Sequence, residues 1–310
     1  MFFVIYSHIP SVNIWRFHDY FFLVGFIFCS GYTFSVKNGL KFRFIRIADS
    51  LIIPYFFFGF VMYFFDYNHL LFFKNDPCGS LLANLYDIVM GKAVWFIPCI
   101  ISIEIIYMLA VKFKITTFVT TGCAILYLSG LINNHSLPWH IDTATYFIFF
   151  FHFGYMLKHH KLQPAKISNA IILPFLLIFI ICSNMIYKLY PFNTSINYFT
   201  NEPITMMVNI VGVLVLVLVA GKMKMNWYIE YIGKNTLLLF YIHLPFVYYI
   251  YKGANQFINL DSPYFNNAVM TILYVFLITL LLYPIVKLIS KSPILSGKGK
   301  VIEYLYYKKQ

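Results

Sequence analysis

The sequence predicts an all-α polytopic membrane protein of about ten transmembrane helices, the first of them incomplete at its N-terminal end. Three observations support this prediction. Of the 310 residues, 61% are hydrophobic and only 11% are charged, whereas soluble domains carry about 25% charged residues. The apolar residues gather into long runs, and the basic residues fall between these runs. Most of the surface therefore suits lipid better than water.

The apolar runs give nine of the predicted helices, because about 20 residues are needed to cross a bilayer core as a helix. The runs cover residues 20–36, 51–65, 94–111, 115–132, 145–157, 169–187, 205–221, 228–251 and 267–289. Residues 2–9 are also apolar but too few to cross. We interpret them as the outer end of a first helix that begins upstream of Met1.

The distribution of Lys and Arg supports ten crossings with both termini in the cytoplasm. With that topology, most of the 23 basic residues fall in inside segments, and the outside segments hold only Arg16, Lys74, Lys92, Lys188 and Lys252. Lys and Arg stay on the cytoplasmic side during insertion. We therefore expect a protein of the plasma membrane, the inner membrane of a bacterium, with one membrane domain filling residues 1–310.

Two other classes of function are disfavoured by the same composition. The formal charge of +12 is scattered between apolar runs, and nucleic-acid binding would need the basic residues gathered into one patch. The five cysteines stand singly, with no Cys-x-x-Cys pair. We therefore predict no nucleic-acid partner, no metal site and no disulfide framework.

Ionisable residues inside apolar runs are the candidates for chemistry, because charge in a membrane is costly. They are His8, Glu104, His152, Glu230 and His243. Several lie in segments that resemble motifs of the acyltransferase-3 family of membrane O-acyltransferases. In chain order the segments are FFVIYSHIP with His8, FFLVGFIFCSGYTFS with Ser30 and Gly31, FRFIRIADSLIIPYFFFGF with Arg43, Arg46 and Pro54, VWFIPCIISIE with Trp95, FHFGYMLK with Gly154, and YIGKNTLLLFYIHLP with Asn235 and His243.

The resemblance implies transfer of an acyl group from acyl-coenzyme A, such as acetyl-CoA, to a hydroxyl of a glycan or lipid-linked sugar. The WFIP and GKNT segments resemble the branch that includes sugar O-acetylases, such as fucose 4-O-acetylases, and poly-N-acetylglucosamine succinyltransferases, so the acyl group could be acetyl or succinyl. In this reading His8 is the general base, since an imidazole can take a hydroxyl proton near neutral pH. We expect desolvation to keep it neutral. The family also places a basic residue eleven positions before this histidine, upstream of Met1.

The remaining site candidates follow from the same resemblance. Arg43 and Arg46 are three residues apart, and guanidinium groups bind phosphate bidentately, so they are expected to hold the phosphates of the donor. An extended pantetheine arm would then carry the acyl group inward. Candidates for the substrate pocket are Trp95, Glu104, Asn235 and His243. Glu104 could orient His8, hold the acceptor or serve structure alone, and His243 is a second candidate base.

Two alternatives stay open at the level of sequence. A secondary transporter or flippase would also carry intramembrane His and Glu, although no pair of Gly/Pro-broken helices recurs in matching halves of the chain. A degenerate, non-catalytic family member would keep the helices without the activity.

Overall fold

The computed structural model describes residues 1–9, 16–36, 39–65, 77–132, 135–159, 168–193, 198–256 and 268–298. These residues are almost entirely helical, with one short antiparallel hairpin. They form two compact units: unit 1 comprises Met1–Trp15, Phe44–Val94 and Met225–Gln310, and unit 2 comprises Arg16–Arg43 and Trp95–Lys224. Unit 1 is thus built from three separate stretches of the chain.

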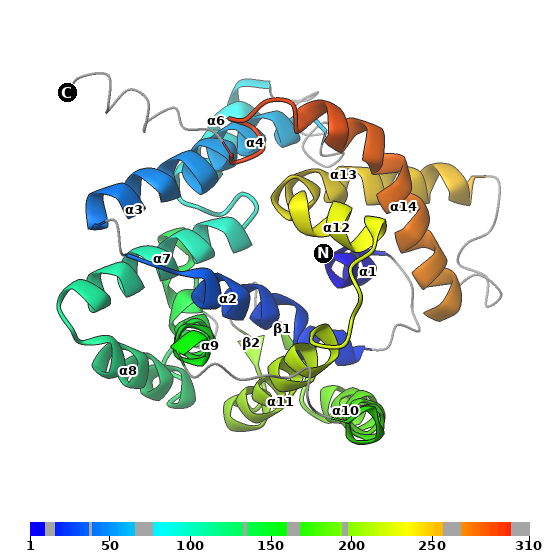
Figure 1. Ribbon diagram of the computed structural model, residues 1–310. Coiled ribbons are helices and arrows are strands. Elements are labelled where there is room, and N and C mark those ends of the chain that lie inside the picture. The colour runs from blue at the N-terminus through cyan, green and yellow to red at the C-terminus, as the bar shows by residue number, and fades with distance from the viewer. Residues whose placement is uncertain are drawn as a thin grey trace. The chain divides into compact units, whose positions relative to one another are not determined.

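Unit 1 places the N-terminal helix against helices from the far end of the sequence (Figure 1). Its helices are α1 (Phe2–His8), the π-helix η2 (Ala48–Ile52), α4 (Ile53–Tyr63), α6 (Pro77–Val89), α12 (Trp227–Lys234), α13 (Thr236–Asn255) and α14 (Ala268–Ile289). α1 contacts α13 and α14, and α4 contacts α6 and α13. Phe58 of α4 stacks on Tyr241 of α13, with ring centroids 4.6 Å apart. This stacking fixes the middle of α13.

A π-helical turn joins α3 (Leu40–Ile47) to α4 and ends just before Pro54. Proline has no N–H, so Pro54 cannot donate to the carbonyl of Ser50, four residues earlier. Gly297, in the segment after α14, packs against this carbonyl oxygen: a Cβ on Gly297 would lie 2.6 Å from it. Gly297 also has φ +68°, a conformation that glycine adopts readily.

Unit 2 is built around α9 (Ile141–His159), which contacts α2 (Phe22–Thr33), α7 (Phe96–Lys112) and α8 (Thr116–Leu128). Its other elements are the 3₁₀ helices η1 (Arg16–Tyr20) and η3 (Pro138–His140), α10 (Asn169–Leu189), the strands β1 (Phe192–Asn193) and β2 (Tyr198–Phe199), and α11 (Glu202–Ala220). The hairpin pairs Phe192 with Phe199.

The crossing of α2 and α9 depends on two glycines. A Cβ on Gly31 would collide with the carbonyl of Phe151, and a Cβ on Gly154 with the carbonyl of Phe28. Each glycine therefore lets the backbone of the other helix approach. Small residues serve this purpose where membrane helices pack closely. Gly31 and Gly154 both belong to the motifs singled out in the sequence.

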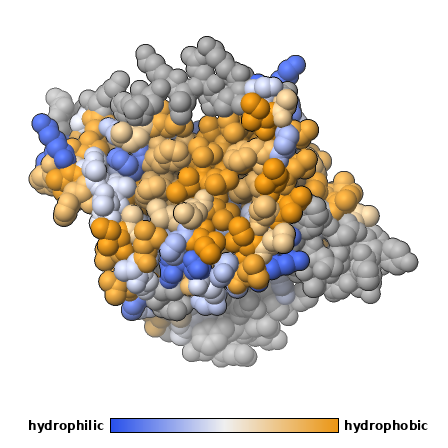
Figure 2. Space-filling model, turned by 90° about the horizontal axis from the view of Figure 1, so that it is seen from below, coloured by the Kyte–Doolittle hydropathy of each residue, from blue (hydrophilic) through white to orange (hydrophobic). Residues whose placement is uncertain are grey.

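Four helical stretches of the described chain are long and apolar enough to span a membrane: Leu40–Val61, Ala170–Leu189, Glu202–Ala220 and Val269–Ile289. They overlap four of the predicted runs. Apolar side chains dominate the face in Figure 2, where hydrophilic residues occur only in small groups. Such an exterior is typical of a membrane protein. The total of ten spans and the placement of the termini stay predictions.

Two differences from the predicted helices concern α6 and the run 228–251. The run 228–251 is not one helix, because it divides at Asn235 into α12 and α13. There the amide of Asn235 donates to the carbonyl of Tyr231 (2.9 Å) and caps the end of α12. Helix α6 was not predicted, because its apolar residues are interrupted by polar ones such as Ser80 and Asn84, both buried.

Candidate functional site

Two histidines of unit 1 face each other across the contact between α1 and α13. The ring centroids of His8 and His243 are 5.2 Å apart, with 49° between the ring planes. His8 is the last residue of α1 and is exposed, whereas His243 is only 1% exposed. The structure therefore brings together the two histidines that the sequence offered as candidate bases.

The hydrogen bonds of His243 define which of its nitrogens carries the proton. Nδ1 lies 3.0 Å from the carbonyl of Leu239 and 2.8 Å from that of Phe240. Carbonyl oxygens only accept, so Nδ1 must be the donor, and in the neutral ring Nε2 then holds the lone pair. Nε2 is buried, with no hydrogen-bond partner among the described residues. Nε2 of His243 is therefore the nitrogen that can accept a hydrogen bond from a group beside it, such as His8.

The exposure of His8 differs from the expected sequestered base. His8 is the last residue of the seven-residue helix α1, and it is exposed. The buried imidazole of the pair is that of His243, which lies in the interior of α13. Unit 1 thus combines an exposed imidazole with a buried one.

Unit 2 contains a buried ion pair between Arg43 and Glu104. Nη2 of Arg43 lies 2.5 Å from Oε2 of Glu104, and the two side chains are 12% and 7% exposed. Ser30 donates to the other carboxylate oxygen (3.0 Å). The guanidinium carbon of Arg43 lies 4.7 Å from the centre of the Phe34 ring. Both oxygens of Glu104 are therefore occupied within unit 2.

Because of this pairing, Arg43 and Arg46 have different environments. The sequence suggested that Arg43 and Arg46 together grip phosphate. Both are in α3, but Arg43 is committed to Glu104, whereas Arg46 is exposed. The sequence could not reveal this difference, because Arg43 and Glu104 are separated by 61 positions.

Trp95 and Asn235 each have contacts within their own unit. Trp95 of unit 2 packs on His140, with ring centroids 5.7 Å apart. Asn235 of unit 1 caps α12, as described above. These two candidates thus have packing and capping contacts. Among the described residues there is no group of three or more His, Cys, Asp or Glu that could hold a metal ion.

Sequence reasoning missed several buried polar residues in unit 2, among them His140 and Asp142. His140 is buried beside Trp95, and Asp142 is buried just after it. Oδ2 of Asp142 accepts a hydrogen bond from the backbone N–H of Leu137 (3.2 Å). Trp139 and His140 both have positive φ, of 59° and 50°, a strained conformation for such residues. The sequence feature that could have indicated these buried residues is the set of polar residues directly before the run 145–157.

The apolar helices and the histidine pair together define a helical membrane protein with a candidate acid–base site. The model of an acyltransferase domain family, Acyl_transf_3, matches residues 1–288. The chain therefore belongs to the acyltransferase-3 family, and it is a membrane acyltransferase in this general sense. No curated protein and no solved structure matches the chain.

Proposed function

We propose that this protein is a membrane O-acyltransferase that moves an acyl group, in the simplest case acetyl, from acyl-CoA to a hydroxyl of a cell-surface or exported glycan. Family membership supports acyl transfer in general. The similarity to the sugar O-acetylase branch suggests the glycan. The single observation that carries the catalytic part is the pairing of His8 with His243 in unit 1.

In the proposed reaction His8 is the general base. It takes the proton of the acceptor hydroxyl while that oxygen attacks the thioester carbonyl and forms a tetrahedral intermediate. The carbon–sulfur bond then breaks, the thiolate of coenzyme A leaves, and the proton on the imidazole returns to the sulfur. The products are an ester and free coenzyme A. The exposure of His8 suits a base that must meet a hydroxyl on a large acceptor.

His243 is proposed as a positioning residue for His8. Its ring is held by two carbonyls of its own helix, so its direction is fixed. Nε2 can accept an N–H from a neighbouring imidazole and so set the tautomer and orientation of His8, as second partners of catalytic histidines do.

The arginines have separate proposed roles. Arg46 is exposed and lies near the expected cytoplasmic end of its helix, so it is proposed to contact the phosphates of the donor. Arg43 supports the same helix through its bond to Glu104.

Membranes that contain the full-length protein test this function. With radiolabelled acetyl-CoA and a glycan acceptor, we expect label to appear in an alkali-labile ester, and His8→Ala to abolish it. Ester formation that survives His8→Ala would remove His8 as the base. Label that accumulates inside vesicles without ester would instead indicate a transporter.

A further inference from the structure

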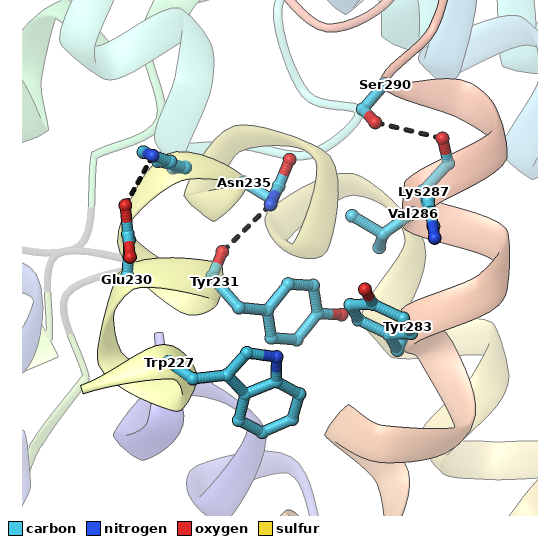
Figure 3. Close-up of a pocket in the computed structure, with 9 residues that line it drawn as sticks. Trp227, Glu230, Tyr231, Asn235, Tyr283, Val286, Lys287 and Ser290 are labelled. Carbon is cyan, nitrogen blue, oxygen red and sulfur yellow. Dashed lines mark hydrogen bonds and ion pairs between the residues drawn. The ribbon is translucent and has the colours of Figure 1, made fainter.

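A pocket in unit 1 has no role in the reaction as described so far. It lies between α12 and the C-terminal end of α14 and has a volume of about 320 Å³ (Figure 3). This volume is at the lower end of the range of about 300–1,000 Å³ that is typical of small-molecule sites. Its chemistry comes mainly from Trp227, Tyr231, Lys234, Asn235, Tyr283 and Lys287.

Three aromatic rings form one wall of this pocket. Trp227 and Tyr231 are one turn apart on α12, and their rings are stacked, with centroids 6.2 Å apart and 22° between their planes. Tyr283 of α14 meets Tyr231 edge to face at 5.1 Å. Trp227 is 57% exposed. A planar ring could therefore stack on its indole without displacing protein atoms.

One cation at the pocket is not neutralised. Lys234 and Glu230 both line the pocket, and they form an ion pair with each other (2.5 Å). Lys287 forms no ion pair with the described residues. Its ammonium group lies 5.8 Å from the centre of the Tyr283 ring. Of the two lysines that line the pocket, Lys234 is paired with Glu230, whereas Lys287 has no ion pair among the described residues and can bind an anion.

These features suit a ligand that combines a planar base with phosphate. The rings offer a stacking surface, and Lys287 offers a charge-assisted hydrogen bond to a phosphate oxygen. The side chain of Asn235 uses its amide N–H to cap α12, which leaves its carbonyl oxygen able to accept from an exocyclic amine or a ribose hydroxyl. A phospholipid head group would use the ammonium group but not the stacking surface.

The position of the pocket connects it to the histidine pair. Asn235 precedes His243 by eight residues, which is about 12 Å along a helix at 1.5 Å per residue. Lys287 and the basic residues after it lie in the segment whose charge predicts the cytoplasmic side. Gly297 lies close to both Ser50, one turn after Arg46, and Leu237, at the start of α13. The Arg46 turn and the start of α13 therefore meet within unit 1.

We propose that the pocket between α12 and α14 binds the nucleotide end of the acyl donor, with the adenine against the aromatic wall and a phosphate at Lys287. This proposal rests on the proposed function, because it assumes an acyl-CoA donor. The pantetheine arm would then run along α13 toward His243 and His8. The separation of the two sites explains why the donor needs a long, flexible arm.

Direct binding tests this assignment without requiring turnover. The probe is radiolabelled adenosine 3′,5′-bisphosphate, the nucleotide end of coenzyme A, added to the full-length protein in phosphatidylcholine nanodiscs. We expect Trp227→Ala and Lys287→Gln each to weaken binding by roughly tenfold, the effect of losing one stacking or charged contact. Trp227→Phe, which keeps a ring, should restore most of the affinity.

Lys291→Gln is the matched control. It removes the same charge one turn beyond Lys287 but does not line the pocket, so binding should stay within about twofold of the wild type. If Lys287→Gln and Lys291→Gln weaken nucleotide binding equally, the effect comes from general surface charge, and the proposal is overturned. Unchanged binding in Trp227→Ala and Lys287→Gln would also overturn it.

Two further measurements separate the alternatives. Phosphatidylglycerol added to the nanodiscs can compete with the nucleotide for the pocket. If this competition is lost in Lys287→Gln but kept in Trp227→Ala, the pocket binds a lipid head group instead. His8→Ala should bind the nucleotide normally while losing acyl transfer. Normal transfer with an unchanged donor KM in Trp227→Ala and Lys287→Gln would refute the pocket alone, whereas failure of transfer in every condition would refute the proposed function.

Discussion

Arg43 and Glu104 form a buried ion pair in unit 2, with 2.5 Å between Nη2 and Oε2. Removing one partner of a buried pair leaves the other charge uncompensated, which typically costs about 3–5 kcal/mol. Arg43→Ala should therefore lower the thermal unfolding temperature of the detergent-solubilised protein. Arg43→Met combined with Glu104→Met should recover much of this loss. A single variant as stable as the wild type would contradict the role assigned to the pair.

Arg46→Ala should affect the donor rather than the fold. Arg46 is exposed, and a hydrogen bond to a charged group contributes about 1.5–3 kcal/mol. We expect the KM for acyl-CoA to rise roughly tenfold or more, with kcat and the unfolding temperature unchanged. Steady-state kinetics at saturating acceptor measure this effect. A donor KM equal to that of the wild type would exclude contact between Arg46 and the phosphates.

His243→Asn tests the role of Nε2 separately from that of Nδ1. The amide of an asparagine at this position can still donate to the carbonyls of Leu239 and Phe240, but it offers nothing in place of Nε2. If Nε2 orients His8, kcat should fall about a hundredfold, while the donor KM and the stability stay near those of the wild type. His243→Gln, which places its polar atoms nearer to Nε2, should restore part of kcat. Full activity in His243→Asn would show that His243 only packs.

The glycines at the crossing of α2 and α9 should not tolerate a methyl group. Gly31→Ala or Gly154→Ala places a Cβ against a backbone carbonyl, and overpacking of this kind costs about 1–3 kcal/mol or more. Gly122→Ala is the control, because Gly122 is also helical but a Cβ there would meet nothing within 4 Å. It should be neutral or slightly stabilising, since alanine is the better helix former. The yield of monodisperse protein after gel filtration reports both outcomes.

Asp19 should make stability depend on pH. Burial raises the pKa of Asp19 to about 7 from the usual 3.8, although Arg16 opposes the shift and His18 lies 3.2 Å away. Between these two pH values the folded protein holds a proton that the unfolded chain has lost. The free energy of unfolding should therefore fall as the pH rises from about 4 to about 7. Asp19→Asn should flatten this part of the curve, and an unaltered slope would show that other groups control it.

Periodicity and composition could predict the helices but not their partners. The runs 169–187, 205–221 and 267–289 correspond to α10, α11 and α14, because a membrane span needs only length and hydrophobicity to be recognised. The break at Asn235 could not be predicted in the same way. An asparagine between Lys234 and Thr236 can continue a helix or cap one, and here both the backbone N–H and the side-chain amide of Asn235 donate to the carbonyl of Tyr231 at the end of α12.

The candidate site was predictable as a set of residues and not as an arrangement. His8 and His243 were both named from motifs, yet nothing in the sequence reports that their rings lie 5.2 Å apart. Gly31 and Gly154 also stood in separate motifs, and only the structure relates them through the close approach of two backbones. Partnership across such distances in the chain depends on tertiary packing, which local patterns do not encode.

The contact between Gly297 and the carbonyl of Ser50 has a consequence for biosynthesis. Membrane proteins are made from the N-terminus onward, so the ribosome produces Ser50 well before Gly297. During that interval the π-helical turn before Pro54 lacks its contact with Gly297. Residues 51–296 are therefore made before this contact can form, and a nascent chain released before Gly297 would lack it.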